Sequence, residues 1–440
     1  MFTKLLSFPS GTGLHRRTVT MTLFSVLATL PVSVTVTGKT VFPDLPSLLE
    51  AQSDKLSSLS GWLATQPLIT SVLGRAGEVT LLAPSNDAIS AISESPFGTQ
   101  LEEDSSLLTA YLAYHVFPGV WPLEALADAT DPVFPMTLMN YVGFANVTGG
   151  QVLRSVVRDG VVFLGSGGGA ESPVIAADLT YTGGIVHIID SPLYLPTLPS
   201  NEMISDGLTA SVGALRRSGL EPSLNQDWAD LTIFAPNNDA FGAIGSEVDN
   251  LTDEQLLDIM KYHVVRDFQD STNGVLYSTD LRNGVGSKYD CPDPLEITTA
   301  QGTTIYVRVI DEEIYVNSAR VIATDWLVGN GVIQILDGVL NPLNPTATPT
   351  PFLKTQPPAW PSAHSTPGGI PFTSGIALET AVVTVTATAT LIPTEIPIPS
   401  DASAVRPWFE PFREDRKKRP IWVSVVWGLG MAMVFAVLMA

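Results

Sequence analysis

The chain has 440 residues, with 44 acidic and 23 basic side chains and a formal net charge of −21. A surface of that sign repels phosphate backbones, so we exclude nucleic acid as a partner. The length is enough for two domains. Cys291 is the only cysteine, so no intrachain disulfide supports them, and this thiol is either a tolerated loop residue or able to pair between chains.

The first predicted element is a secretory signal sequence at residues 1–38. A short basic run, His15–Arg17, precedes an uncharged stretch from Thr18 to Gly38. A charged start followed by an apolar stretch is typical of such signals. Pro31 and the threonines dilute the stretch, so we expect a cleaved signal rather than a spanning helix.

A first domain is predicted at residues 44–196, with helices before strands. Leucines at roughly helical spacing predict a helix over Ser47–Ala64. The segment VTLLAPSNDAI (Val79–Ile89) predicts a short strand, ended by Pro84, and then a helix for which Asn86 is a suitable cap. Alternating strands follow, so the pattern is mixed α+β.

A second domain is predicted at residues 199–343 because the chain repeats itself. The linker between the domains, LPTLPS, is short and contains proline, so we expect semi-rigid neighbours. Three segments of the first domain return in the same order, at offsets of about 150 residues, which is the size of a whole domain. They are LTIFAPNNDAF (Leu231–Phe241) for VTLLAPSNDAI, IMKYHV (Ile259–Val264) for YLAYHV (Tyr111–Val116), and NGVIQILD (Asn330–Asp337) for GGIVHIID (Gly183–Asp190).

The second domain has clearer boundaries for its elements. Apolar spacing predicts a helix over Gly207–Gly219 that stops at the glycine. Thr252–Gln255 has the pattern of a capping box at the start of another helix. Strands are predicted over Thr303–Ile310 and Glu313–Asp325, and a buried strand closes the domain.

Residues 344–420 are rich in proline and threonine and predict an extended, O-glycosylated and disordered stalk with a basic end at Arg416–Arg419. Residues 421–440 carry no charge and are long enough to span a bilayer as a helix. The alternative is a lipid-anchor attachment signal whose tail is removed. Either would attach the protein to a membrane.

Other motifs are few. Gly165–Ala170, GSGGGA, imitates a dinucleotide-binding fingerprint, but Pro173 follows too closely for a helix to hold a pyrophosphate, so we expect a hairpin loop. We find no motif for a metal or a cofactor. Asn146 and Asn250 begin Asn-x-Thr sequences and are predicted N-glycosylation sites.

The repeated segments resemble the motifs of the fasciclin-like domain. TLLAPSNDAI and TIFAPNNDAF look like its first signature, the Tyr-His pairs like its central motif, and IVHIID and VIQILD like its closing signature. The resemblance covers about 300 residues and implies an α+β fold in each copy, a wedge-like, seven-stranded β-sandwich with flanking helices. The stalk and the hydrophobic ends are similar to those of fungal members.

The resemblance also suggests binding residues. In animal members, Asp-Ile motifs ahead of the Tyr-His pair, and the pair itself, are linked to integrin binding. The first copy has Ala110 where the motif has aspartate, and Gln334 replaces the closing histidine found at His187. We favour structural roles, because no motif places a catalytic partner near the histidines. The candidate binding residues are Tyr114, His115, Asp258, Ile259, Tyr262 and His263.

The function that this resemblance implies is adhesion at the cell surface through protein or glycan partners, with self-association as an option and no catalysis. An alternative keeps the same topology on the vacuolar membrane, where lumenal domains would serve docking or fusion. A glycan-acting enzyme is a further alternative, but it requires two carboxylates in a cleft, and the sequence places no such pair.

Overall fold

The computed structural model describes residues 34–376 apart from 37–38, 76–78, 142, 249, 270, 272, 285–292, 345–348, 351–352 and 354. Most of the predicted signal, Cys291 and the hydrophobic segment 421–440 therefore lie outside the described residues. The first described elements are the paired strands β1 (Val34–Val36) and β2 (Lys39–Val41). Two copies of one α+β arrangement follow.

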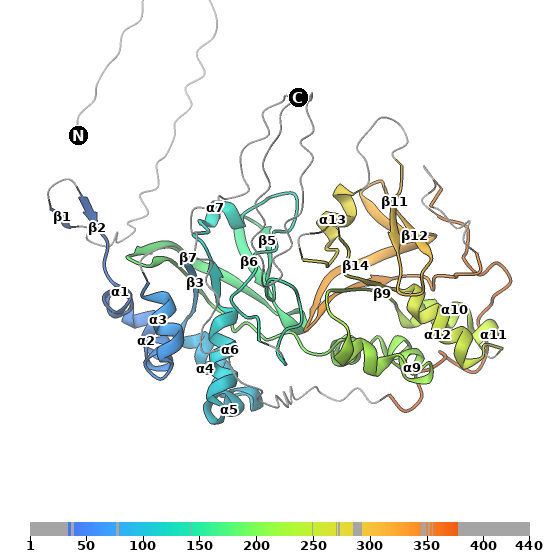
Figure 1. Ribbon diagram of the computed structural model, residues 1–440, viewed down its shortest axis with the longest axis horizontal. Helices are drawn as coiled ribbons and strands as arrows, with labels where there is room; N and C mark the ends of the chain where they lie inside the picture. Colours follow the sequence, from blue (N-terminus) through green and yellow to red (C-terminus); the bar gives the residue numbers. More distant parts are fainter. Residues whose placement is uncertain are drawn as a thin grey trace, which may run out of the picture. The chain divides into compact units, whose positions relative to one another are not determined.

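Domain 1 has its helices largely before its strands, as predicted (Figure 1). The expected helix over 47–64 is two helices, because the backbone breaks at Gln52. The described sheet has the order β4-β3-β8-β7-β6-β5, with β3 and β8 parallel and the other pairs antiparallel. Its elements are α1 (Leu45–Ala51), α2 (Ser53–Ala64), α3 (Pro67–Leu73), β3 (Val79–Pro84), α4 (Asn86–Ser93), α5 (Pro96–Glu103), α6 (Ser105–Tyr114), β4 (Val116–Pro118), α7 (Leu123–Leu126), β5 (Arg154–Arg158), β6 (Val161–Gly165), the 3-10 turn η1 (Gly167–Gly169), β7 (Glu171–Tyr181) and β8 (Gly184–Ile189).

Domain 2 repeats this order with one more described strand, β10-β9-β15-β14-β13-β12-β11. The strand expected over 313–325 is a hairpin, because Asn317 adopts a left-handed conformation (φ 49°) between β13 and β14. The capping box at Thr252 and Gln255 is present. The elements are α8 (Pro199–Ser205), α9 (Thr209–Arg217), the π-helical turn η2 (Ser223–Asp227), β9 (Leu231–Pro236), α10 (Asn238–Ala243), α11 (Gly245–Val248), α12 (Asp253–Tyr262), β10 (Val264–Arg266), α13 (Ser278–Asn283), β11 (Leu295–Thr298), β12 (Thr304–Ile310), β13 (Glu313–Val316), β14 (Ala319–Val328) and β15 (Gly331–Leu336).

The long strands β7 and β14 each belong to both halves of their sheet, because they pair with different neighbours along their length. Their first residues pair with β6 or β13, and the remainder pairs with β8 or β15 after register shifts. A bulged strand bends and twists more strongly than a regular one, so it can turn from one half into the other. Apolar residues of the helices and the central strands bury together into the core of each domain.

The prediction that Asn86 caps a helix is wrong. Asn86 and its counterpart Asn238 are the first residues of α4 and α10. The caps are Ser85 and Asn237, whose side chains accept from the backbone N–H three residues on. Asn86 and Asn238 instead each accept a backbone N–H of the neighbouring helix, α2 or α9, at 2.9 Å. They therefore connect two helices rather than end one.

The stalk prediction is wrong for its first part. Residues 359–376 do not stand away from domain 2 but run along its helices, where Trp360, Ala363, Phe372 and Ile376 pack against the apolar core. In Figure 1 this orange-brown segment passes around α10 and α11. The aromatic residues among the prolines and threonines supply apolar surface that composition alone did not reveal.

Candidate functional site

The two Tyr-His pairs lie inside their domains, where a helix meets a strand. Tyr114 ends α6 and Tyr262 ends α12, and neither side chain is more than 1% exposed. The Tyr114 hydroxyl donates to the carbonyl of Val152, two residues before β5, at 3.1 Å, and the Tyr262 hydroxyl donates to that of Thr304, the first residue of β12, at 3.0 Å. Each tyrosine thus ties a helix end to the chain at the outer half of the sheet, and a partner protein has no access to it.

The histidines of these pairs end the same helices. His115 and His263 donate from Nδ1 to the carbonyl oxygen of the residue four positions earlier, each at 2.8 Å. In domain 2, Nε2 of His263 accepts the N–H of Leu340 at 2.9 Å. Burial lowers the pKa of both imidazoles to about 4, so they are neutral at pH 7.

The two histidines differ in one bond. Nε2 of His115 has no hydrogen-bonding partner among the described residues, although the ring is fully buried. His263 therefore connects α12 to the chain that follows β15, whereas His115 makes only its helix-ending bond. Neither ring reaches solvent, so these residues support the fold and offer no base to a substrate.

The closing signature is a second internal site. Nδ1 of His187 accepts the N–H of Asp178 at 3.2 Å, and its Nε2 donates to the carbonyl of Trp121 at 2.8 Å. In domain 2, Oε1 of Gln334 accepts the N–H of Asp325 at 3.1 Å. Glutamine also has one acceptor and one donor group, so it replaces the histidine without loss of the bond to the bulged strand.

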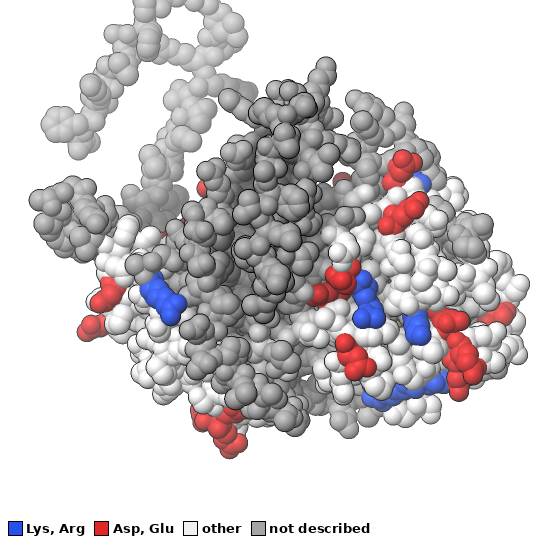
Figure 2. Space-filling model, in the orientation of Figure 1, with Lys and Arg blue, Asp and Glu red and all other residues white. Residues whose placement is uncertain are grey.

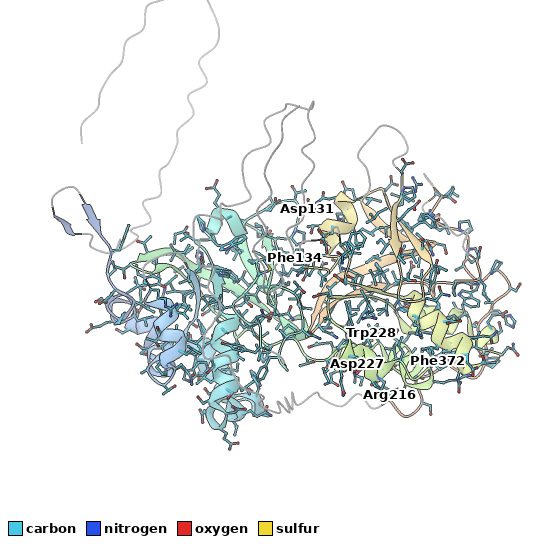
Figure 3. All side chains as sticks on the ribbon, viewed as in Figure 1. Asp131, Phe134, Arg216, Asp227, Trp228 and Phe372 are labelled. Carbon is cyan, nitrogen blue, oxygen red and sulfur yellow. The ribbon has the colours of Figure 1, made fainter. Side chains whose placement is uncertain are left out.

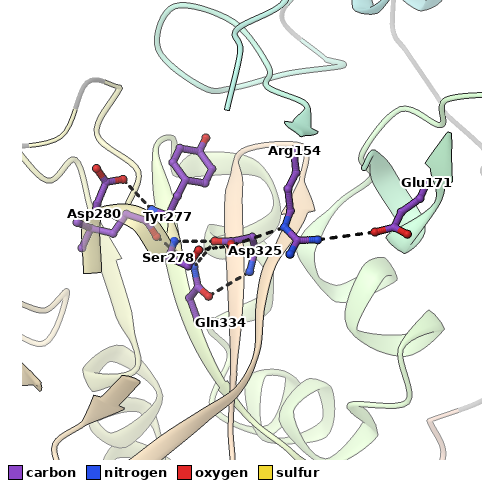
Figure 4. A network of polar contacts seen from close by, with 8 residues as sticks. Arg154, Glu171, Tyr277, Ser278, Asp280, Asp325 and Gln334 are labelled. Carbon is purple, nitrogen blue, oxygen red and sulfur yellow. Dashed lines mark hydrogen bonds and ion pairs between the residues drawn. The ribbon is translucent and has the colours of Figure 1, made fainter. Parts of the chain in front are cut away.

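Two aspartates of this site connect the bulged strands β7 and β14 to the short helices α7 and α13. Asp178 and Asp325 both have positive φ, 58° and 63°, within β7 and β14. The Asp178 carboxylate accepts the N–H of Leu123, at the start of α7, at 3.0 Å. The Asp325 carboxylate accepts the N–H of Ser278, at the start of α13, at 2.7 Å (Figure 4). These repeated aspartates were not identified from the sequence, although aligning the two copies would have revealed them.

Asp258 is the only exposed member of the six candidate binding residues. It lies on α12, while the neighbouring Ile259 is 4% exposed and faces the core. An Asp-Ile motif read by a partner would thus present its aspartate alone. The binding role of all six residues stays a prediction, with direct contact feasible at Asp258.

The domains meet through a shared apolar cluster that the sequence did not predict. Phe134 of domain 1 stacks on Tyr277 of domain 2, with ring centroids 4.3 Å apart and planes 20° apart (Figure 3). Because a cluster built from both copies loses its apolar contacts when they separate, it holds the domains together. Its buried members are Val147, Val152, Val275, Tyr277, Leu327 and Val332.

Polar bonds surround this cluster. Both carboxylate oxygens of Asp230 accept from Thr148, from its N–H at 2.6 Å and its hydroxyl at 2.7 Å. Arg154 lies with Nε 3.8 Å from the buried Asp325 carboxylate, which is ion-pair distance but too long for a hydrogen bond (Figure 4). Buried charges of this kind need partners, and domain 1 supplies hydrogen bonds to Asp230 and a positive charge near Asp325.

The glycine-rich segment 165–170 also lies in the contact region between the two domains, here called the joint. It connects β6 to β7, as the hairpin prediction required. The N–H of Gly168 donates to Glu202 of α8 at 3.1 Å, and a Cβ at Gly169 would lie 2.7 Å from the Trp326 ring. The glycines thus permit close approach of domain 2, rather than of a nucleotide.

The predicted glycosylation sites are both exposed. Asn146 lies at the joint, where its backbone N–H donates to the carbonyl of Gly329 at 2.7 Å and its amide to that of Trp228 at 3.4 Å. Asn250 precedes α12, and its amide donates to the carbonyl of Ser246 at 3.1 Å. Either side chain is accessible to a glycan, and modification stays a prediction.

The described part of domain 2 also borders a cavity. A cavity of about 540 Å³ between domain 2 and residues 355–363 is lined by one carboxylate, Asp337, whose Oδ2 lies 3.5 Å from Nε of Arg320. Glycoside hydrolysis uses two carboxylates, so this cavity does not favour the enzyme alternative. On the face drawn in Figure 2, several basic side chains lie beside acidic ones. One ion pair of domain 2 joins Nε of Arg217 to Oδ1 of Asp253 at 3.0 Å.

Within the described ranges, no grouping of three His, Cys, Asp or Glu side chains suits a metal ion. The described part of the chain also contains no helix with the length and apolar character of a membrane span.

Comparison with known proteins bears on both copies. The family model of the Fasciclin domain matches residues 54–196 and 206–342, which confirms the predicted duplication. A fasciclin-like arabinogalactan protein of Arthroderma benhamiae is 34% identical over 365 residues, covering 82% of this chain and 80% of that protein. The fasciclin-like arabinogalactan protein CTB11 of Cercospora beticola is 30% identical over 66% of this chain and 75% of its own length. A solved FAS1 domain pair from the insect cell adhesion molecule fasciclin I shows 21% identity and a TM-score of 0.32, covering 66% of this chain and 98% of its own.

Proposed function

Because the chain belongs to the fasciclin-domain family, we propose that it is a cell-surface adhesion protein that binds protein or glycan partners through the outer surfaces of its paired domains. The observation that carries this proposal is where the reactive residue types lie. In both domains the tyrosines and histidines of the Tyr-His pairs, and the aspartates of the bulged strands, bond to the protein's own backbone. What remains for function is surface, which suits binding rather than catalysis.

The paired domains suit adhesion in a second respect. The apolar cluster and the Thr148–Asp230 bonds fix one domain against the other. Surfaces held in a fixed relation bind a partner with less loss of conformational freedom than surfaces on a flexible linker. We further propose that the C-terminal segment 421–440 attaches the protein to a membrane, as a helix or as an anchor signal.

The experiment is surface labelling of intact cells. An epitope inserted after residue 380, beyond the segment that packs on domain 2, is detected with an antibody that does not cross membranes. Labelling of intact cells supports a surface protein, and release by phospholipase then assigns a lipid anchor. Labelling that requires permeabilisation and coincides with the vacuolar rim would replace adhesion with the docking alternative.

A further inference from the structure

Residues 359–376, here called the strap, follow the helical face of domain 2 and bond to it along their length. The Trp360 indole donates to the carbonyl of Val339 at 2.9 Å. Further along, His364 and Ser246 of α11 bond twice: the Ser246 N–H donates to the His364 carbonyl, and the His364 N–H donates to the Ser246 hydroxyl, each at 3.0 Å. These two bonds hold the strap against α11, and its backbone turns before and after them.

An aromatic residue anchors the far end of the strap. Phe372 packs edge-on against the fully buried Phe241 of α10, with ring centroids 5.6 Å apart. The guanidinium of Arg217, in the last turn of α9, lies 5.6 Å from the centroid of the same ring. Phe372 (Figure 3) therefore contacts two different helices, with edge-to-face and cation–π geometry.

Glycines form the floor beneath the strap. A Cβ on Gly213, in the middle of α9, would lie 1.9 Å from the carbonyl oxygen of Phe372, and one on Gly245 would lie 2.9 Å from the Thr366 hydroxyl. Glycine inside a helix costs about 1 kcal/mol relative to alanine. Because Gly213 and Gly245 have no side chain, the strap can lie directly against the helices.

Domain 1 provides the comparison within the same chain. Gly61 of α2 precedes Gly213 by 152 residues, the offset that separates Thr80 from Thr232, so the two glycines are equivalent. No atom lies within 4 Å of a Cβ built on Gly61, and this residue is exposed, whereas Gly213 is buried. Among the described residues, the same helical face is thus open at Gly61 in domain 1 and covered at Gly213 in domain 2.

We propose that the face of domain 2 formed by α9, α10 and α11 is a binding groove for a proline-containing peptide with aromatic anchors, and that the strap occupies it in cis as a latch. The strap contains three prolines and no Asp, Glu, Lys or Arg. The prolines lower the entropy lost on docking, and the lack of charge avoids repulsion from an acidic protein. The latch does not depend on the adhesion function.

The latch has two consequences. While it is closed, it denies the helical face of domain 2 to other proteins, whereas no described residue covers the equivalent position, Gly61, in domain 1. A pull on the residues beyond Ile376 is transmitted first to the strap's contacts with the helices, and only after their release to β15. The groove would then become available to a second copy's strap or to a similar peptide.

Hydrogen exchange with mass spectrometry on the full chain tests the latch. In the wild type, peptides within 359–376 should exchange about tenfold or more slowly than an unstructured segment. Gly213→Ala should abolish this protection, because the new methyl group displaces the Phe372 carbonyl. Gly61→Ala is the matched control and should leave the strap's protection unchanged.

Peptides from β9 and β15 report whether domain 2 is folded in each variant. If Gly213→Ala unfolds the domain, Phe372→Ala removes the anchor from the strap side and should also abolish protection. Unprotected exchange of the wild-type strap would overturn the proposal. So would a folded Gly213→Ala or Phe372→Ala variant whose strap stays as protected as in the wild type.

Discussion

His187 in domain 1 and Gln334 in domain 2 make the same two bonds, one accepted from a backbone N–H of the bulged strand and one donated to a loop carbonyl. The accepted bond requires that Nδ1 of His187 carry no proton. Burial lowers the pKa of this imidazole, which agrees with a neutral ring. The second copy has a residue that makes both bonds and does not titrate.

His187→Gln should therefore preserve domain 1 at neutral pH and reduce its sensitivity to acid. Because the folded-state pKa lies below the ordinary value, the stability contributed by neutral His187 is present above about pH 6.5 and is lost as the pH falls. We expect the free energy of unfolding at pH 7 to change by less than about 1 kcal/mol. Denaturant unfolding at pH 7 and pH 5 measures both effects, and a loss above about 2 kcal/mol at pH 7 would contradict the equivalence.

The buried histidines His115 and His263 should make the whole pair sensitive to acid. Their pKa falls from 6.5 to about 4 on folding, and one pKa unit corresponds to about 1.4 kcal/mol. Each then contributes on the order of 3 kcal/mol, present above about pH 6.5 and lost as the pH approaches 4.

Asp206 opposes this effect, because burial raises its pKa to about 6 and its protonation favours the folded state. Burial also raises the pKa of Glu202 and of Asp280, which act in the same direction. The acid titration is therefore best measured as the difference in stability between the wild type and a His115→Gln, His263→Gln variant, which share these carboxyl groups. A difference that stays constant between pH 6.5 and 4.5 would show that the two imidazoles are not buried as described.

The absence of a bond to Nε2 of His115 among the described residues predicts unequal effects of truncation. His263→Ala leaves the N–H of Leu340 unpaired in the interior, whereas His115→Ala removes only the helix-ending bond. We expect His263→Ala to cost about 1–3 kcal/mol more, the penalty for an unsatisfied buried donor. Thermal unfolding of both variants provides the comparison, with His364→Ala as an exposed control, and equal losses would refute the assignment.

The joint should make the two domains unfold together. Phe134→Ala removes the ring that stacks on Tyr277, and large-to-small changes of this kind cost up to about 3–5 kcal/mol when the ring is fully buried. Because Phe134 is half-buried, we expect about half of that cost and a calorimetric transition that separates into two. Phe42→Ala, at an exposed phenylalanine, should keep one transition, and two transitions in the wild type would argue against a coupled pair.

The elements that occur in both domains were predicted from the sequence, whereas the contacts between the domains and the packing of the strap on domain 2 were not. The strand over Val79–Pro84 and the capping box at Thr252 follow from local patterns and are correct. The split of the segment 313–325 depends on the turn at Asn317, which interrupts a continuous β-branched and aromatic pattern.

The joint and the strap had no local signal. Nothing in the sequence around Arg154 or Asp230 indicates that these residues contact the other domain, because the contacts depend on how the two domains pack together. The strap has only two aromatic anchors, Trp360 and Phe372, in a segment without helical or strand periodicity. Contacts between a unique segment and a repeated domain cannot be inferred from the repeat.

The most direct test of the account is the adhesion of cells that normally make this protein. Cells lacking it should detach from a surface or from one another at lower shear than wild-type cells, and the full chain should restore attachment. Phe134→Ala, which loosens the domain pair, should restore it less well than Phe42→Ala at equal surface level. Wild-type attachment of cells that lack the protein would contradict the adhesion function.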